Sequence, residues 1–155
     1  MEPIEIRIAD FDDPQTRDLL ALHLAGMRAS SPPESVYALD LSGLKKPEIT
    51  TWTAWRGDHL AGIGALRMLN AEAAEIKSMR TRPDFLNQGV GKAILAHIVE
   101  TAKQRGIKRL SLETGSGPAF DAAVQLYRNF GFQFGEPFGD YVPTGFSQFL
   151  HLQIA

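Results

Sequence analysis

The pattern of apolar residues changes its period at Gly89 and Gly91, and this change limits the folds open to the chain. Before these glycines, apolar and polar residues alternate strictly from Ile4 to Ile8, as they do in a strand with one buried face, and residues 50–55 are β-branched and aromatic, as is typical of strands. After them, apolar residues recur at Ile94, Leu95 and Ile98, which is helical spacing. Strand–helix–strand units after a run of antiparallel strands predict a mixed α/β fold around one sheet.

The expected elements follow from the same patterns and from the glycine and proline turns between them. Strands are predicted over residues 4–8, 50–55, 60–69, 74–81, 107–114, 132–134 and 147–154. Helices are predicted from Pro14 to the stop at residues 30–33, over 34–41, from Val90 to Gly106, and over 120–130. The order is therefore β-α-α-β-β-β-α-β-α-β-β. No linker or repeat divides the chain, so we expect one domain over residues 1–155.

The composition excludes several classes of protein. The chain has 155 residues, of which 44% are hydrophobic and 22% charged, as in globular domains. It has no Cys, which excludes disulfides, thiolate metal sites and a cysteine nucleophile. The 4 His residues form no metal-binding spacing, so we expect no metal. No apolar run could span a bilayer and the N-terminus is acidic, so we expect a cytoplasmic protein with no membrane partner.

The net charge of −2 is unevenly distributed. Residues 77–109 hold 8 of the 16 Lys and Arg residues but 2 of the 18 Asp and Glu residues. A local excess of positive charge in an acidic protein indicates a bound anion, although a solvated basic helix face has the same composition. Aromatic residues do not alternate with these basic ones, so we expect no nucleic-acid partner.

The segment Asn87-Gln88-Gly89-Val90-Gly91-Lys92 lies between a predicted strand and a predicted helix. Its glycines allow backbone N–H groups to point at one spot, and the helix N-terminus and Lys92 add positive charge. The segment is neither a Walker loop nor a dinucleotide fingerprint. It predicts a binding site for a phosphate or pyrophosphate, and the alternative is a turn that needs glycine only for its backbone geometry.

Two motifs at a fixed separation resemble those of a known superfamily, the GNAT N-acetyltransferases, which transfer an acetyl group from acetyl-CoA to an amine. The first is the phosphate segment preceded by Leu86, and the second, A-x-x-L-Y-x-x-x-G-F, covers residues 123–132. The resemblance implies an acyl-CoA N-acyltransferase fold over the whole chain. Two residues depart from it: Leu86 stands where the family has Arg or Gln, and Phe120 where many members have Asn. The contact that this Asn makes could come instead from Thr114 or Ser116.

The resemblance also implies catalytic roles. Tyr127 matches the family tyrosine that lies near the thioester sulfur, so we expect it to protonate the departing thiolate; its ring could instead only pack in the core. Glu75 is the expected base, because some members have a Glu at this place. It could instead pair with Lys77 or Arg67, and Glu113 or an ordered water could take its role.

The remaining expected contacts also come from the resemblance. The residues expected to bind acetyl-CoA are Met79, Arg80, Thr81, Leu86, Asn87, Gln88, Gly89, Val90, Gly91, Lys92, Thr114, Ser116, Phe120 and Tyr127. The residues expected to contact the acceptor are Ser31, Glu34, Ser35, Tyr37 and Tyr141, with Asp140 beside the last. The expected acceptor is a small-molecule or amino-acid-like amine, and a homodimer is possible.

Two other functions fit the same motifs. A non-catalytic module that binds or senses CoA would keep the glycine segment but would not turn over a substrate. A protein-interaction domain with a vestigial fold is supported only by the two departures from the family motif, Leu86 and Phe120. The presence of both Glu75 and Tyr127 favours the enzyme.

Overall fold

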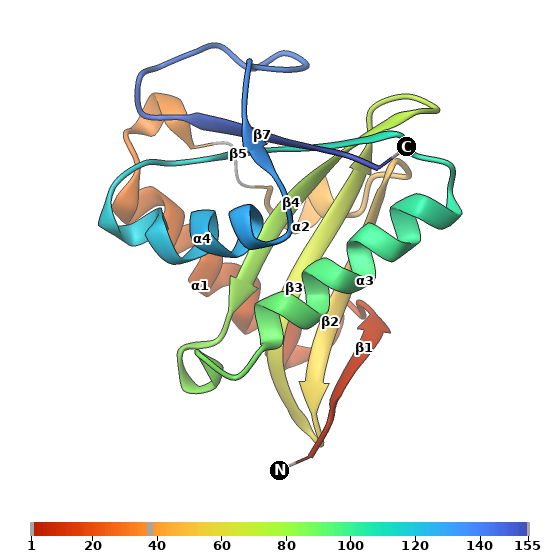
Figure 1. The fold of residues 1–155 in the computed structure, drawn as a ribbon. Helices are drawn as coiled ribbons and strands as arrows, with labels where there is room; N and C mark the ends of the chain where they lie inside the picture. Colours follow the sequence, from red (N-terminus) through yellow and green to blue (C-terminus); the bar gives the residue numbers. More distant parts are fainter. Residues whose placement is uncertain (1, 37–38, 155) are drawn as a thin grey trace.

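The computed structural model describes residues 2–36 and 39–154, and its strands form one seven-stranded sheet in the order β1-β2-β3-β4-β5-β7-β6 (Figure 1). The strands are β1 (Ile4–Ile8), β2 (Ile49–Arg56), β3 (His59–Met68), β4 (Ala73–Thr81), β5 (Arg109–Thr114), β6 (Gln133–Phe134) and β7 (Gln148–Gln153). The helices are α1 (Pro14–Ser30), α2 (Leu41–Leu44), α3 (Val90–Gln104) and α4 (Asp121–Asn129). The predicted mixed α/β fold and its order of elements are confirmed.

The helix predicted over residues 34–41 is wrong in position. A 3₁₀ turn, η1 (Pro33–Ser35), stands at its start, and α2 begins only at Leu41. The reason is the cap at Asp40, whose carboxylate accepts a hydrogen bond of 2.8 Å from the N–H of Gly43. A side-chain acceptor at this place fixes the start of a helix, and the sequence reading did not use Asp40 as a cap.

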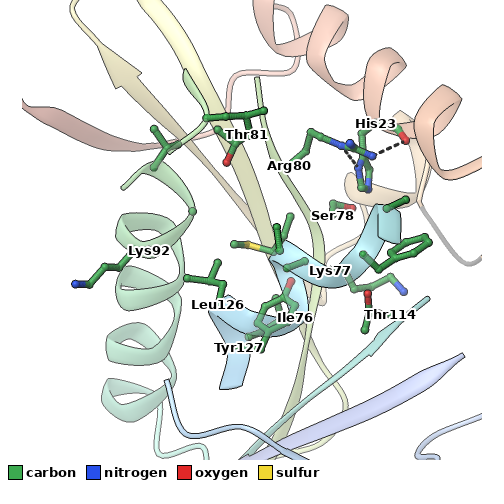
Figure 2. Close-up of a pocket in the computed structure, with 18 of the residues that line it drawn as sticks. His23, Ile76, Lys77, Ser78, Arg80, Thr81, Lys92, Thr114, Leu126 and Tyr127 are labelled. Atoms are coloured by element: carbon green, nitrogen blue, oxygen red, sulfur yellow. Dashed lines mark hydrogen bonds between the residues drawn. The ribbon is translucent and has the colours of Figure 1, made fainter. Parts of the chain in front are cut away.

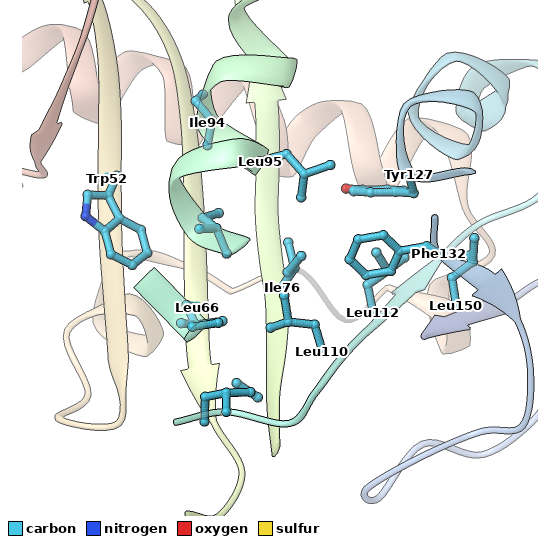
Figure 3. Packing of buried hydrophobic residues seen from close by; sticks show 14 of the residues in the cluster. Trp52, Leu66, Ile76, Ile94, Leu95, Leu110, Leu112, Tyr127, Phe132 and Leu150 are labelled. Atoms are coloured by element: carbon cyan, nitrogen blue, oxygen red, sulfur yellow. The ribbon is translucent and has the colours of Figure 1, made fainter. Parts of the chain in front are cut away.

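Helices cover both faces of the sheet, with α3 in front of it in Figure 1 and α1 behind. Behind the sheet, Leu19 and Leu20 of α1 pack with Leu60 and Ile63 of β3. In front of it, a larger apolar cluster joins α3 and α4 to the strands (Figure 3). The labelled residues of this cluster are Trp52, Leu66, Ile76, Ile94, Leu95, Leu110, Leu112, Tyr127, Phe132 and Leu150.

Gly64 lets α3 lie close against β3. A Cβ atom at this position would lie 2.6 Å from Cγ2 of Ile94 and 2.7 Å from Sδ of Met79. A glycine that looks like a weak point in a strand therefore serves helix–sheet packing. Among the described residues, no helix is long and apolar enough to cross a membrane.

The sheet opens between β4 and β5, which is its one parallel pair in the described part of the chain. Their pairing covers only Ala73–Arg109, Ala74–Leu110 and Glu75–Ser111. Beyond Glu75 the two strands diverge, so the edge of β4 that faces β5 lacks a strand partner. An unpaired strand edge offers N–H and C=O groups to a ligand.

Candidate active site

A cavity of about 440 Å³ lies where β4 and β5 diverge (Figure 2). Its walls come from α1, β4, the segment that leads into α3, the end of β5, and α4. These elements lie far apart in the sequence, and the opening of the sheet brings them together. A concave site with apolar walls and a few charged groups is the usual form of a small-molecule site.

The segment before α3 presents backbone donors to this cavity. Asn87 and Gly89 have positive φ angles of 62° and 82°, and no side chain caps α3. The first hydrogen bond of the helix runs from the N–H of Ala93 to the carbonyl of Gly89, over 3.0 Å. The N–H groups of Val90 and Gly91 thus have no partner within the helix. Free N–H groups and the helix dipole make this end of α3 suited to an anion.

The two glycines of the segment serve different purposes. Gly89 needs its positive φ, which other residues adopt with strain. Gly91 is helical, and a Cβ there would lie 3.2 Å from Cδ2 of Leu126 in α4. Gly91 therefore lets α3 and α4 approach each other at the wall of the cavity.

A bulge in β4 decides which side chains share a face of the sheet. Ser78 has a φ of 58°. In β3 one residue separates Ile63 from Ala65, whereas in β4 two residues separate their partners Arg80 and Lys77. Ile63 and Ala65 both pack on the α1 side of the sheet. Arg80 and Lys77 therefore lie on that side too, although strict alternation would separate them.

The cavity consequently has two unlike parts. On the α3 and α4 side its walls are mainly apolar, formed by Ile76, Met79, Leu126 and Tyr127. On the α1 side they are polar, formed by His23, Glu75, Lys77, Arg80 and Glu113, which we call the polar lobe. Figure 2 shows this separation, with Arg80 directed toward His23 and Lys92 on the opposite side.

Tyr127 belongs to the apolar part. Its side chain is buried and its ring packs edge-on against Phe132, with the centroids 5.8 Å apart. Its hydroxyl points toward β4 (Figures 2 and 3) and makes no hydrogen bond within the described residues. Burial raises the pKa of Tyr127, so the phenol stays protonated at neutral pH.

Glu75 is 1% exposed and is held by several partners. Nζ of Lys77 lies 3.3 Å from Oε2, Nη1 of Arg67 lies 3.8 Å from Oε1, and the hydroxyl of Tyr141 donates a hydrogen bond to Oε2. Lys77 also donates to the hydroxyl of Tyr141 over 2.9 Å. Burial and the charge of Glu75 raise the pKa of Tyr141, so it remains a donor. Glu75 thus pairs with both Lys77 and Arg67, the ionic partners considered from the sequence.

Glu113 is the second carboxyl group of the polar lobe, and it makes no ion pair within the described residues. Burial raises its pKa from 4.5 to about 7, although the Ser147 hydroxyl and the Lys77 ammonium oppose the shift. A carboxyl group whose pKa lies near 7 is suited to accept a proton at physiological pH.

Arg80 is anchored on α1. Its Nε donates to Nδ1 of His23 over 3.0 Å, and Nη2 reaches the His23 carbonyl at 3.5 Å (Figure 2). Burial and the neighbouring guanidinium lower the pKa of His23 to about 4, so His23 is neutral. The sequence reading missed His23 as a cavity residue, because it lies on the apolar stripe of α1 without any spacing motif.

Comparisons with known proteins agree with this geometry. The Acetyltransferase (GNAT) family profile matches residues 16–132. The chain belongs to the GNAT acetyltransferase family. It is 52% identical over 138 residues to the uncharacterized N-acetyltransferase YsnE of Bacillus subtilis (strain 168), covering 89% of this chain and 91% of that one. It is 46% identical over 149 residues to the uncharacterized N-acetyltransferase YedL of Escherichia coli (strain K12), covering 96% and 94%.

A solved structure shares the fold. A GNAT family acetyltransferase from Elizabethkingia anophelis, solved with acetyl-CoA bound, superposes with a TM-score of 0.71 at 21% identity, covering 99% of each chain. The resemblance read from the two motifs is therefore confirmed, and this GNAT enzyme is an N-acetyltransferase.

The cavity of this GNAT enzyme gathers most of the residues expected to bind acetyl-CoA or to act in catalysis. Those that line it are Glu75, Met79, Arg80, Thr81, Leu86, Asn87, Gly89, Val90, Gly91, Lys92, Thr114, Phe120 and Tyr127. Gln88 and Ser116 do not line it, and the side chain of Arg80 lies on the α1 side rather than by the glycine segment. Leu86, the first departure from the family motif, is 55% exposed at the cavity rim.

Of the residues expected to contact the acceptor, Ser31, Ser35 and Tyr141 are described by the structure and do not line the cavity. Ser35 is buried and donates to Thr144 over 2.9 Å, and neither it nor Ser31 lines the cavity. Tyr141 does not line the cavity, but its hydroxyl forms hydrogen bonds with Glu75 and Lys77 of the polar lobe. Glu34 belongs to η1, Asp140 is exposed, and Tyr37 lies outside the described residues.

Proposed function

We propose that the enzyme transfers the acetyl group of acetyl-CoA to the primary amine of a small molecule, by direct attack while both substrates are bound. The observation that carries this proposal is the two-part cavity. Its apolar part begins at the free N–H groups of α3, and its polar part holds carboxylates that can bind and deprotonate an amine. The two parts meet at the unpaired edge of β4.

The residues present fit CoA. The N–H groups of Gly89, Val90 and Gly91 and the nearby Lys92 suit a pyrophosphate. The backbone of Met79 and Thr81 lies on the free edge of β4, where an amide-containing arm would bind as an added strand. Acetyl-CoA supplies the acyl thioester; the chain orients it and excludes water from it.

We assign Glu113 as the base. An amine is protonated at neutral pH and must lose a proton before it attacks. Glu113 faces the cavity without an ionic partner, whereas Glu75 is held by Lys77, Arg67 and Tyr141. Glu75, the base expected from the sequence, is assigned the alternative role of fixing Lys77 and Tyr141 at the lobe.

Tyr127 is assigned as the acid. The amine nitrogen attacks the acetyl carbon and gives a tetrahedral oxyanion. As this adduct collapses, the carbon–sulfur bond breaks, the thiolate takes the phenolic proton of Tyr127, and the tyrosinate recovers a proton from the new amide nitrogen. A backbone N–H near Met79 is assigned to the oxyanion, since the free edge of β4 offers such donors beside the apolar part. Holding both substrates in one cavity supplies much of the remaining rate enhancement.

The test is the release of CoA thiol from acetyl-CoA, read with a thiol reagent across a panel of amines. The chain has no Cys, so it adds no thiol background. Amine-dependent release is expected, and Tyr127→Phe should lower kcat without changing the affinity for acetyl-CoA. Acetyl-CoA binding without release for any amine would instead favour a CoA sensor, and the absence of both would refute the assignment of the cavity.

A comparison of Glu113→Gln with Glu75→Gln decides the base. We expect Glu113→Gln to remove the rise in rate with pH near 7. Glu75→Gln should keep that rise, because it removes no proton acceptor from the reaction. The reverse result would return the base's role to Glu75, and two unchanged pH profiles would leave it to an ordered water.

A further inference from the structure

Arg80 is a half-buried cation of the cavity wall that has no acidic partner among the described residues. It makes no ion pair with any residue that the structure describes, although burial lowers its pKa and so disfavours its charge. The other cation of the polar lobe, Lys77, has Glu75 at 3.3 Å. Because a charge that is partly withdrawn from water and has no ionic partner is costly, the Arg80 guanidinium in this cavity is expected to meet an anion from outside the chain.

The contacts of Arg80 hold the guanidinium without neutralising it. His23 is a neutral acceptor for Nε, so it orients the group and leaves Nη1 without a hydrogen bond in the described part of the chain. Gly26, one turn further along α1, makes room for it, since a Cβ there would lie 2.9 Å from Nη2. The planar guanidinium of Arg80 therefore keeps N–H donors that can bind both oxygens of a planar anion such as a carboxylate.

The charges around Arg80 narrow the ligand further. The same lobe contains Glu75 and Glu113, which favour a cationic amine and oppose a second negative charge on the ligand. A carboxylate carries one negative charge and matches one guanidinium, whereas a phosphate carries more. The acceptor that fits the whole lobe therefore has an amine at one end and a carboxylate at the other.

We infer that Arg80, positioned by His23, binds the carboxylate of the acceptor, so that the enzyme acetylates amino carboxylates. This inference rests on the proposed function for the reaction, but it makes a separate statement about binding. The position of Arg80 on the acceptor side, and not on the CoA side, is the observation on which it depends.

The test compares matched acceptors in the presence of CoA or acetyl-CoA. The probes are phenylalanine, glutamine, β-alanine and 4-aminobutyrate, each with its carboxamide, and O-phosphoethanolamine as a phosphate. Calorimetry with CoA-loaded enzyme measures binding, and thiol release measures turnover. We expect at least one amino carboxylate to exceed its carboxamide by about 100-fold in affinity or in kcat/KM.

Variants of Arg80 assign the effect to the guanidinium. In Arg80→Gln, the amino carboxylate and its carboxamide should have nearly equal kcat/KM values, because the KM of the carboxylate rises. The affinity for acetyl-CoA should stay unchanged. Arg80→Lys should keep part of the ratio because it keeps the charge. Arg28→Gln, which removes an exposed arginine of the same helix, is the matched control and should change neither.

The outcomes separate the two proposals. Binding of an amino carboxylate that Arg80→Gln abolishes, without turnover, would support the carboxylate site and refute the transferase function. Turnover of amides and acids with equal kcat/KM would support the function and overturn the inference. Binding of no amino carboxylate, or tighter binding of O-phosphoethanolamine, would also overturn it. A thermal midpoint and far-UV circular dichroism spectrum confirm that each variant is folded.

Discussion

Replacement of Glu113 by Gln is expected to change activity and stability in opposite directions. The fold raises the pKa of this carboxyl group from 4.5 to about 7, chiefly by burial. The folded protein therefore binds the Glu113 proton more tightly than the unfolded chain does. Ionised Glu113 opposes folding, and its cost develops as the pH rises from 4.5 through 7.

The size of the effect follows from the shift. One pKa unit corresponds to about 1.4 kcal/mol, and solvent at the mouth of the cavity reduces the total, so we expect a cost of about 2 kcal/mol above pH 8. The carboxamide of Gln has nearly the shape of the protonated acid and carries no charge. Glu113→Gln should therefore raise the free energy of unfolding by about 2 kcal/mol at pH 8.5 and leave it almost unchanged at pH 5.

Urea unfolding at both pH values measures this difference, and thiol release gives the rate. The rate should fall by about 100-fold or more, because Gln cannot accept the amine proton. The control is Glu100→Gln on the exposed face of α3, which should change neither quantity. Equal destabilisation by Glu113→Gln at both pH values, or an unchanged rate, would refute the argument from a buried, ionisable base.

Three other predictions test different parts of the molecule. Tyr127→Phe should lower kcat by about 10- to 100-fold while the thermal midpoint stays within a few degrees, since its ring still packs on Phe132. The free energy of unfolding should fall by up to about 3 kcal/mol as the pH drops from 6.5 to 4, because His23 becomes protonated in the unfolded chain but stays neutral in the folded state. In a urea-unfolding series over this pH range, His23→Asn should remove most of this fall. Gly64→Ala should lower the free energy of unfolding by about 1–3 kcal/mol, because the new Cβ would lie 2.6 Å from Ile94.

The sequence predicts those parts of the fold that depend on neighbouring residues. The strand over residues 4–8 and the start of α1 at Pro14 agree with the structure because alternation and a proline at the first helical position are local signals. The end of α3 is also local, since Gly106 adopts a φ of 77° just after it. The displaced second helix shows the limit, because a short helix depends on its cap more than on its apolar pattern.

The candidate site likewise has one part that local sequence predicts and one part that depends on residues far apart in the chain. The glycine segment before α3 is continuous in sequence, and both its position and its geometry could be predicted. The polar lobe is assembled from α1, β4 and β5, whose proximity depends on where two strands diverge. No spacing in the sequence joins His23 to Arg80, and none indicates that Tyr141 would meet Glu75 from 66 residues away.

The family resemblance placed Arg80 among the CoA contacts, and the bulge at Ser78 explains why its side chain lies instead on the α1 side of the sheet. Strict alternation from Lys77 would put Arg80 on the same face as Ile76, beside the glycine segment. The extra residue shifts the register by one, so that Arg80 returns to the face of Lys77 and reaches His23. One residue of register thus determines which substrate the guanidinium meets. In the proposed arrangement the apolar part keeps its backbone donors for CoA, and Arg80, the one cation of the described lobe without an acidic partner, is left for the acceptor.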